Sequence, residues 1–375
     1  MSTTFAWQNV HKPSGDPVRF QEIAGRALAG ERVDEEDALF LLHDASLADL
    51  CALGGEMRRR RVPGDAITFV IDTNPNYTNV CTTDCLFCAF YRKPGDAEGY
   101  WHSVDEIVAM VRRAVEKGAT TTLLQGGHNP QIPFSYYVDV VRALRANFPD
   151  VCAHLWSPSE IRTMAEISGQ SVREVLAALW DAGQRTIPGG GAEILVDRVR
   201  KRISPKKASA EQWLEVMRIA HDIGYRSTAT MMYGHAETDE EIVEHLRKLR
   251  ELQDETRGFT SFVPWSFKPG NTLLEKKIPE SPGPVKYLRI IALARIYLDN
   301  FDHIQASWFS EGKKTGQIAL HAGGDDFGGT LIEENVLREA RHHNTTTTEE
   351  CVALIKDAGF RPVQRTTLYE HLREW

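Results

Sequence analysis

Three cysteines lie close together near the start of this chain, in the stretch VCTTDCLFCAFYR. Cys81, Cys85 and Cys88 have the spacing C-x3-C-x2-C. A loop this short can wrap three thiolates around one inorganic cluster, but it contains no fourth cysteine or histidine to close a tetrahedral zinc site. One metal corner would therefore stay open. The chain has three other cysteines, all far from this loop: Cys51, Cys152 and Cys351.

The neighbours of these thiols are apolar. Phe87, Ala89, Phe90 and Tyr91 would exclude water from an iron–sulfur cluster and help to tune its potential. The alternatives are a zinc site completed by a distant residue and a set of buried structural thiols. We favour the cluster, because structural thiols rarely need such close spacing and the loop leaves a coordination position open.

The pattern C-x3-C-x-aromatic-C, with Phe87 in the aromatic position, resembles the signature of the radical S-adenosylmethionine (SAM) enzymes. The resemblance implies that the three cysteines hold a 4Fe-4S cluster whose fourth iron binds the amino and carboxylate groups of SAM. In that family an electron from the cluster cleaves the sulfonium and gives a 5′-deoxyadenosyl radical. The protein then serves to position and shield the cofactor.

The same resemblance implies a set of SAM-binding residues. Gly126 and Gly127 match the glycine motif after the second strand, where bare backbone lets the methionine amino group come close. Ser157 and Glu160 fall where the end of the third strand meets the cofactor's ribose, and Glu193 after the fourth strand could hold a polar group of SAM. Taken singly, a glycine pair is often a turn and a glutamate is often a helix cap.

The elements that must position these residues alternate between strands and helices. From Ala66 onward, short apolar or β-branched runs alternate with longer amphipathic stretches, which predicts a parallel α/β sheet. Eight such units favour a (β/α)8 TIM-type barrel of the radical SAM kind, residues 66–375 with the C-terminal helices, behind an N-terminal helical cap at 1–65. The candidate strands are 66–72, 120–127, 151–157, 184–190, 227–234, 260–267, 303–309 and 317–323.

Finer stretches narrow the resemblance within the family. NYTNVCTTDCLFCAFYR, LLQGGHNP, GGGAEIL, FVPWSFKPGNT, IQASWF and GGDDFGGTLIEEN resemble the cyclic dehypoxanthine futalosine synthases of the futalosine route to menaquinone. Aminofutalosine synthase and the tyrosine-using subunit of deazaflavin (FO) synthase share the cysteine loop and the GGGAEIL-like stretch, so both stay open as alternatives. His128 departs from the expected pattern after the glycine pair; we expect it to face solvent, the alternative being a local acid or base.

The resemblance to the cyclases implies a substrate in which a ribose is joined through a ketone chain to a carboxylated benzene ring. The adenosyl radical would take the C4′ hydrogen, and the ribose radical would add to the ring, which then loses an electron and a proton. Gln305 and Ser307, two apart in one predicted strand, could contact this substrate. Asp325 and Asp326 could accept the proton or bind hydroxyls, or could form an ordinary polar turn.

The carboxylate of such a substrate calls for a cation. Lys268 and Lys313 lie near predicted strand ends, and the sequence does not choose between them.

Composition limits the partners. There are 44 lysines and arginines against 52 aspartates and glutamates, a net charge of −8, which argues against nucleic acid and against a DNA-binding metalloregulator. No apolar stretch is long enough for a membrane span, and the N-terminus lacks a secretory pattern. We therefore expect a cytoplasmic enzyme with a small-molecule substrate and a reducing electron donor such as flavodoxin or ferredoxin. The rival of another class is a noncatalytic iron–sulfur or zinc protein.

Overall fold

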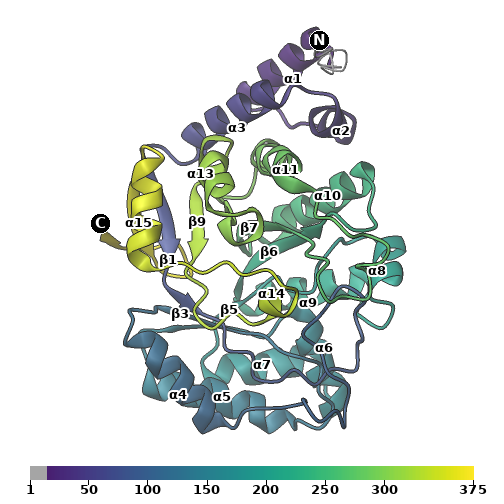
Figure 1. Ribbon diagram of the computed structural model, residues 1–375, viewed down its shortest axis with the longest axis vertical. Helices are drawn as coiled ribbons and strands as arrows, with labels where there is room; N and C mark the ends of the chain where they lie inside the picture. The colour runs from purple at the N-terminus through teal and green to yellow at the C-terminus, as the bar shows by residue number, and fades with distance from the viewer. Residues whose placement is uncertain (1–14) are drawn as a thin grey trace, which may run out of the picture.

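The computed structural model describes residues 15–375 and opens with three helices. The helices α1 (Pro17–Leu28), α2 (Glu35–His43) and α3 (Leu47–Arg61) lie together at one end of the molecule (Figure 1). Asp16 and Asp34 cap the first two by accepting backbone N–H groups. Gly54 lets α3 approach α11 (Gly283–Tyr297), because a Cβ there would lie 3.0 Å from the Cα of Ala292. These helices are the described part of the predicted N-terminal helical cap at 1–65, of which residues 1–14 lie outside the described residues.

A parallel sheet curls through the rest of the chain. Its strands pair in sequence order from β2 to β8, and every pairing is parallel. Its strands are β2 (Asp72–Thr73), β3 (Thr121–Leu124), β4 (Cys152–Leu155), β5 (Thr186–Ile187), β6 (Arg226–Tyr233), β7 (Phe259–Ser266) and β8 (His303–Ile304). The strand β1 (Ala66–Val70), which precedes β2, belongs to a second sheet of four strands.

The strand β9 (Asp326–Gly329) closes this sheet into a barrel. It pairs in parallel with β1, and an isolated parallel bridge between Gln305 and Asp326 joins it to the end of β8. Because β1 continues almost directly into β2, the two sheets form one curled surface with helices outside it (Figure 1). The predicted α/β barrel is confirmed.

The position of the eighth strand was predicted wrongly. Residues 317–323 lie mostly in the helix α13 (Lys313–His321), whereas the strand is β9, which follows two glycines. The buried residues Gly316, Ala319 and Leu320 recur at three- and four-residue intervals, which is the spacing of a helix face. Gly323 then has a φ of +136°, a conformation that few other residues adopt, and turns the chain into β9.

Capping boxes begin several of the helices that cover the barrel. Ser103 with Glu106 and Thr238 with Glu241 are two of these reciprocal pairs. None of the helices within residues 15–375 is long and apolar enough to cross a membrane. The remaining helices are α4 (Val104–Val115), α5 (Phe134–Asn147), α6 (Pro158–Ser168), α7 (Val172–Ala182), α8 (Asp197–Ile203), α9 (Ala210–Ile223), α10 (Asp239–Thr256), α12 (Trp308–Glu311), α14 (Val336–Glu339) and α15 (Thr348–Asp357).

The C-terminal strands extend the sheet on the other edge of β1. The strand β10 (Arg361–Arg365) pairs in parallel with β1, and β11 (His371–Glu374) returns antiparallel to β10. The loop between them reaches the barrel, because the hydroxyls of Thr367 and Thr121 are 2.7 Å apart. The end of the chain thus contributes side chains to the barrel interior.

Candidate active site

One cavity of about 360 Å³ extends from the cysteine loop to the loop between β10 and β11. Most of the residues predicted to bind the cluster, SAM or the substrate line it together. These are Cys81, Cys85, Cys88, Phe87, Gly126, Gly127, Ser157, Glu160, Glu193 and Gln305.

The three thiols sit in a loop that its own backbone holds in place. The N–H of Cys81 donates to the carbonyl of Arg92 at 2.8 Å, and the N–H of Cys88 donates to that of Cys85 at 3.1 Å. Burial raises the pKa values of both Cys85 and Cys88 above the ordinary range of a thiol. Such thiols become thiolates when a bound cationic centre compensates the cost, so the loop fits a metal-based group.

The three thiols provide the donor set that an iron–sulfur cluster needs. Within residues 15–375, no three His, Cys, Asp or Glu side chains converge on a point that would hold one metal ion. A 4Fe-4S cluster spreads its thiolates over separate irons, and three cysteines that line one cavity fit that requirement.

The glycine pair lies directly against the cysteine loop. A Cβ at Gly127 would lie 2.1 Å from the carbonyl oxygen of Val80 and 2.9 Å from the Cβ of Cys81. A Cβ at Gly126 would lie 2.6 Å from the ring of Tyr77. Only glycine fits at these two positions, so the end of β3 and the cysteine loop form one wall of the cavity.

Ser157 and Glu160 begin α6 as a capping box, and Glu160 does more than cap. Its Oε2 accepts from the N–H and hydroxyl of Ser157, and its Oε1 accepts at 3.0 Å from both the N–H of Gly126 and the hydroxyl of Tyr77. Burial raises the pKa of this carboxyl. Because both oxygens already have protein donors, Glu160 fixes the glycine pair and has little capacity left for a ligand.

Glu193 forms a buried ion pair with Lys207 on the same side of the cavity. Burial alone would raise the pKa of Glu193, but the charges of Lys207 and Arg200 outweigh burial and lower it. The ammonium of Lys207 also lies 5.4 Å from the centre of the Phe87 ring. The aromatic residue of the cysteine motif is therefore tied to Glu193 through one lysine.

The two residues predicted to touch the substrate from the seventh strand differ in placement. Gln305 lines the cavity, whereas Ser307 is fully buried behind it, 3.3 Å from the amide nitrogen of Gln305. The strand ends at Ile304 and α12 begins at Trp308, so the expectation that both side chains share one strand face is wrong.

The two aspartates predicted as catalytic lie in buried ion pairs outside the cavity lining. Asp325 binds Arg295 and is 2.6 Å from Nδ1 of His303. Asp326 binds Arg365 through both oxygens and accepts from the hydroxyl of Thr68 at 2.6 Å. Both stand at the start of β9, not at its end, because the eighth strand follows them. Neither Asp325 nor Asp326 contacts the cavity, which a catalytic role would require.

The other sequence predictions were also misplaced. Lys268 is buried against Glu311, and Lys313 pairs with Glu350 at 2.7 Å; neither lines the cavity. His128 lines the cavity instead of facing solvent, and its Nδ1 is 2.9 Å from the hydroxyl of Thr163. Burial lowers the pKa of His128 to about 3, so the imidazole is neutral.

Several cavity residues escaped the sequence analysis. Asp72, His154, Arg365 and Tyr369 all line the cavity, and burial lowers the pKa of His154 to about 3. His154 and Asp72 carried a readable signal, since His154 is a polar residue inside an apolar strand and Asp72 is the polar last residue of an apolar run. Arg365 and Tyr369 carried none, because only the pairing of β10 with β1 brings the end of the chain to the barrel.

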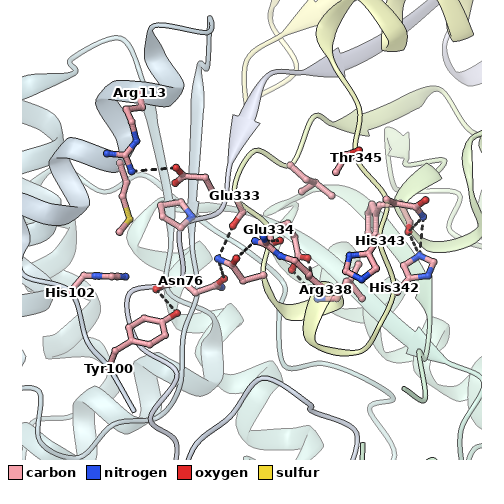
Figure 2. A pocket seen from close by; sticks show the side chains of 17 residues that line it. Asn76, Tyr100, His102, Arg113, Glu333, Glu334, Arg338, His342, His343 and Thr345 are labelled. Carbon is pink, nitrogen blue, oxygen red and sulfur yellow. Dashed lines mark hydrogen bonds and ion pairs between the residues drawn. The ribbon is translucent and has the colours of Figure 1, made fainter. Parts of the chain in front are cut away.

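A second cavity, of about 450 Å³, shares lining residues with the first. Figure 2 shows the side chains that line it. Leu331, Glu334 and Leu337 line both cavities, so the chain around α14 forms a partition between them. On the side shown in Figure 2, Glu333 pairs with Arg113 at 3.4 Å, and the side chains of Asn335 and Asn76 are 3.2 Å apart. These contacts fasten the partition to the barrel.

The comparisons with known proteins agree with this geometry. The family description "Radical SAM superfamily" matches residues 76–249, and "CofH/MqnC C-terminal region" matches residues 256–375. The HydG maturase of the FeFe-hydrogenase from Carboxydothermus hydrogenoformans has a TM-score of 0.73 at 16% identity, covering 94% of this chain and 81% of that one. Methylornithine synthase has a TM-score of 0.71 at 17% identity, covering 91% and 97%. These structures share the fold.

Three relatives cover nearly the whole chain. Cyclic dehypoxanthine futalosine synthase from Streptomyces coelicolor is 44% identical, over 94% of this chain and 88% of the relative. The enzyme of the same name from Halalkalibacterium halodurans is 41% identical, over 94% of each. Aminodeoxyfutalosine synthase from Thermus thermophilus is 42% identical, over 96% and 97%.

With these similarities and the cysteine-lined cavity, the chain belongs to the radical SAM family of enzymes. Within that family, its last part carries the C-terminal region shared by CofH and MqnC proteins.

Proposed function

We propose that this enzyme is a cyclase that converts dehypoxanthine futalosine to cyclic dehypoxanthine futalosine in menaquinone biosynthesis. The observation that carries the proposal is the similarity, over 94% of the chain, to two enzymes of that name from different organisms. A barrel cavity that extends from the cysteine loop to a polar end at Arg365 and Tyr369 also suits a long substrate with a ribose and an aromatic acid.

Cys81, Cys85 and Cys88 would hold the 4Fe-4S cluster in this proposal. When bound, cluster and SAM supply a radical able to remove a hydrogen atom from the substrate. The backbone at Gly126 and Gly127 leaves room for the methionine part of SAM, and Glu160 holds that backbone rigid. The buried pair of Glu193 and Lys207 presents further polar groups to the cofactor.

The substrate would occupy the part of the cavity beyond the cofactor. Gln305, Thr228 and Ser261 line it and offer amide and hydroxyl groups to the ribose. The hydroxyl of Ser261 has no hydrogen-bond partner among residues 15–375, and the same holds for Nδ1 of His154. Buried polar groups without partners are costly, so a polar ligand between these strands would stabilise them.

The wider setting belongs to the same proposal. A reducing protein of the flavodoxin or ferredoxin kind supplies the electron, and the reaction takes place in the cytoplasm. The chain divides into a helical cap at 1–65 and a catalytic barrel at 66–375. The barrel walls keep water from the radical, since an enclosed apolar and hydrogen-bonded cavity prevents side reactions.

The aminodeoxyfutalosine and FO synthase reactions are the alternatives, because enzymes that catalyse them are nearly as similar to this chain. Aminodeoxyfutalosine synthase is 42% identical to this chain, and a 5-amino-6-(D-ribitylamino)uracil–L-tyrosine 4-hydroxyphenyl transferase from Methanopyrus kandleri is 39% identical over 96% of this chain. Identity at this level does not separate three reactions that share one barrel.

Substrate assays separate them. The reconstituted enzyme is incubated anaerobically with SAM, a reductant and dehypoxanthine futalosine, and both products are analysed by mass. We expect one 5′-deoxyadenosine for each product, and a product lighter than the substrate by two hydrogen atoms. Turnover only of the aminofutalosine precursor, or only of tyrosine with the ribityluracil, would contradict the proposal.

A further inference from the structure

The proposed cyclisation needs a proton acceptor inside the cavity, because the benzene ring must lose a proton to regain aromaticity. The sequence suggested Asp325 and Asp326, but neither lines the cavity. Carboxylates are common proton acceptors in active sites. Within residues 15–375, four of them line the cavity: Asp72, Glu160, Glu193 and Glu334.

Three of these carboxylates are already engaged. Glu160 accepts hydrogen bonds at both oxygens, as described above. Glu193 is neutralised by Lys207. Glu334 caps the start of α14, where its oxygens accept from the N–H groups of Val336 at 2.8 Å and Leu337 at 3.0 Å. Taking up a proton would break these contacts, so none of the three is suited to repeated proton transfer.

Asp72 differs because one of its oxygens is free. Its Oδ1 accepts from the N–H of Leu331 at 2.7 Å, whereas its Oδ2 accepts no hydrogen bond from residues 15–375. The residue is only 3% exposed and yet lines the cavity, so a ligand would reach the free oxygen from the cavity. Gly329 leaves space beside it, since a Cβ there would lie 2.2 Å from Oδ2.

The surroundings of Asp72 suit a group that gains and loses a proton. Burial raises its pKa to about 6, against the opposing effects of the Leu331 N–H and the charge of Arg365. The charged groups that face it are Arg365 of β10 and Asp326 of β9, which bind each other, and the thiol of Cys351 in α15 lies nearby. Asp72 therefore has no ion-pair partner of its own among them.

The two histidines of the cavity are weaker candidates. Burial lowers the pKa values of His128 and His154 to about 3 each, which makes them poor proton acceptors. His128 also lies at the end of the cavity occupied by the glycine pair and the cysteine loop, where its carbonyl accepts from the N–H of Thr82 at 3.1 Å. That end is the one assigned to the cofactor.

We propose that Asp72 is the catalytic residue that takes the proton from the benzene ring after the ribose radical has added to it. This role rests on the proposed cyclase function. In the step, the C–H bond at the attacked ring carbon breaks, its proton goes to Oδ2 of Asp72, and its electron pair rejoins the ring. The surplus electron leaves to a one-electron acceptor of the iron–sulfur class, and the spirocyclic product remains.

The variant Asp72→Asn keeps the shape of the side chain and its contact with Leu331 but cannot accept a proton. With substrate deuterated at C4′, we expect labelled 5′-deoxyadenosine at near the wild-type yield in a single turnover, because hydrogen abstraction precedes the step. Formation of the spirocycle should fall by about 100-fold or more, the usual range for loss of a general base. The matched control is Glu174→Gln, an exposed carboxylate outside the cavity lining, which should change neither quantity beyond twofold.

The pH profile provides a second readout. Asp72 must be ionised to accept the proton, so spirocycle formation by the wild type should decline as the pH falls through about 6. The residual rate of Asp72→Asn should not show this decline. Should Asp72→Asn fail to fold, Asp72→Glu replaces it; the longer carboxylate should keep C4′ abstraction and shift the midpoint of the profile.

Three results would overturn the inference. They are a wild-type rate of cyclisation in Asp72→Asn, loss of labelled 5′-deoxyadenosine together with the spirocycle in a folded variant, or an unchanged midpoint in Asp72→Glu. Failure of the function proposal looks different, because the wild type itself would then form no spirocycle.

Discussion

At the residue scale, Glu160 and Glu174 occupy the same position in two capping boxes with opposite surroundings. Each accepts from the N–H and hydroxyl of a serine three residues earlier. Glu174 is exposed, whereas Glu160 is 3% exposed and also binds Gly126 and Tyr77. Comparing Glu160 with Glu174 therefore distinguishes the effect of a helix cap from the effect of the additional contacts with Gly126 and Tyr77.

We expect Glu160→Gln to destabilise the protein by about 1–3 kcal/mol, since its amide would face donors that then lose their acceptor. SAM affinity should fall as well, because Gly126 is no longer fixed. Glu174→Gln should change both quantities little. Urea unfolding and isothermal titration with SAM test this, and equal effects of the two substitutions would contradict the role given to Glu160.

The cysteine loop gives a second prediction at this scale. Cys85→Ala should remove most iron and sulfide from the reconstituted protein and abolish cleavage of SAM, while the circular dichroism spectrum stays that of the wild type. Cys51→Ala, in α3, is the matched control and should keep both the cluster and the cleavage. Production of 5′-deoxyadenosine by Cys85→Ala at the normal rate would refute the ligand assignment.

The sequence predicted which residues line the cavity near the cysteine loop far better than those at its opposite end. The thiols and glycines lie in short loops directly after strands, so local spacing was enough to place them. Arg365 and Tyr369 reach the cavity from the end of the chain, which local spacing does not predict, and Asp72 was missed although it is the polar last residue of an apolar run. Asp325 and Asp326 resembled strand-end chemistry, but their partners Arg295 and Arg365 are distant in sequence.

At the element scale, backbone hydrogen bonds join the segment after β3 to the cysteine loop, and the hydroxyl of Thr82 adds a side-chain bond to the carbonyl of His128 at 3.2 Å. The carbonyl of Thr78 accepts from the N–H of Gly127 at 2.9 Å, and the carbonyl of His128 accepts from that of Thr82 at 3.1 Å. These bonds hold the two segments so close that a Cβ at Gly127 would overlap Val80. There is no room for a side chain at Gly127 in this contact.

We therefore expect Gly127→Ala to displace the cysteine loop and to lower the iron content of the reconstituted protein at least several-fold. Gly25→Ala is the control, because a Cβ at that position in α1 meets no atom within 4 Å. It should leave the iron content unchanged and stabilise the helix by about 0.5–1 kcal/mol. Iron analysis of both variants measures this effect. A wild-type iron content in Gly127→Ala would contradict the close packing of the cysteine loop against Gly127.

The misplaced strand at 317–323 shows where sequence patterns fail for such elements. The stretch QIALHAG is short and apolar, and it does not distinguish a buried strand from one face of a helix. The true strand, DFGG, carries an aspartate and two glycines and looked like a turn. Its burial comes from β1 and the bridge to Gln305, which are long-range pairings.

At the scale of the whole molecule, the C-terminal segment completes the barrel interior. Arg365 is 5% exposed and Asp326 is fully buried, so their ion pair crosses between β10 and β9 inside the protein. The pair holds a cavity residue in place and ties the end of the chain to the fold. The alternating strand and helix pattern predicted the barrel, but it carried no information about this closure.

We expect Arg365→Met to destabilise the protein by about 3–5 kcal/mol, because it leaves the buried carboxylate of Asp326 without a partner. The double variant Arg365→Met/Asp326→Leu should recover much of that loss, since no charge is left uncompensated. Urea unfolding measures both. A single variant as stable as the wild type would contradict the structural role of Asp326 and return it to the candidates for catalysis.

The fate of the C4′ hydrogen tests the central claim most directly. Dehypoxanthine futalosine deuterated at C4′ is turned over once with SAM, and the 5′-deoxyadenosine is analysed by mass. The account predicts that it carries the deuterium, with one SAM consumed for each spirocycle. Unlabelled 5′-deoxyadenosine alongside the spirocycle, or a product that contains adenine, would contradict it.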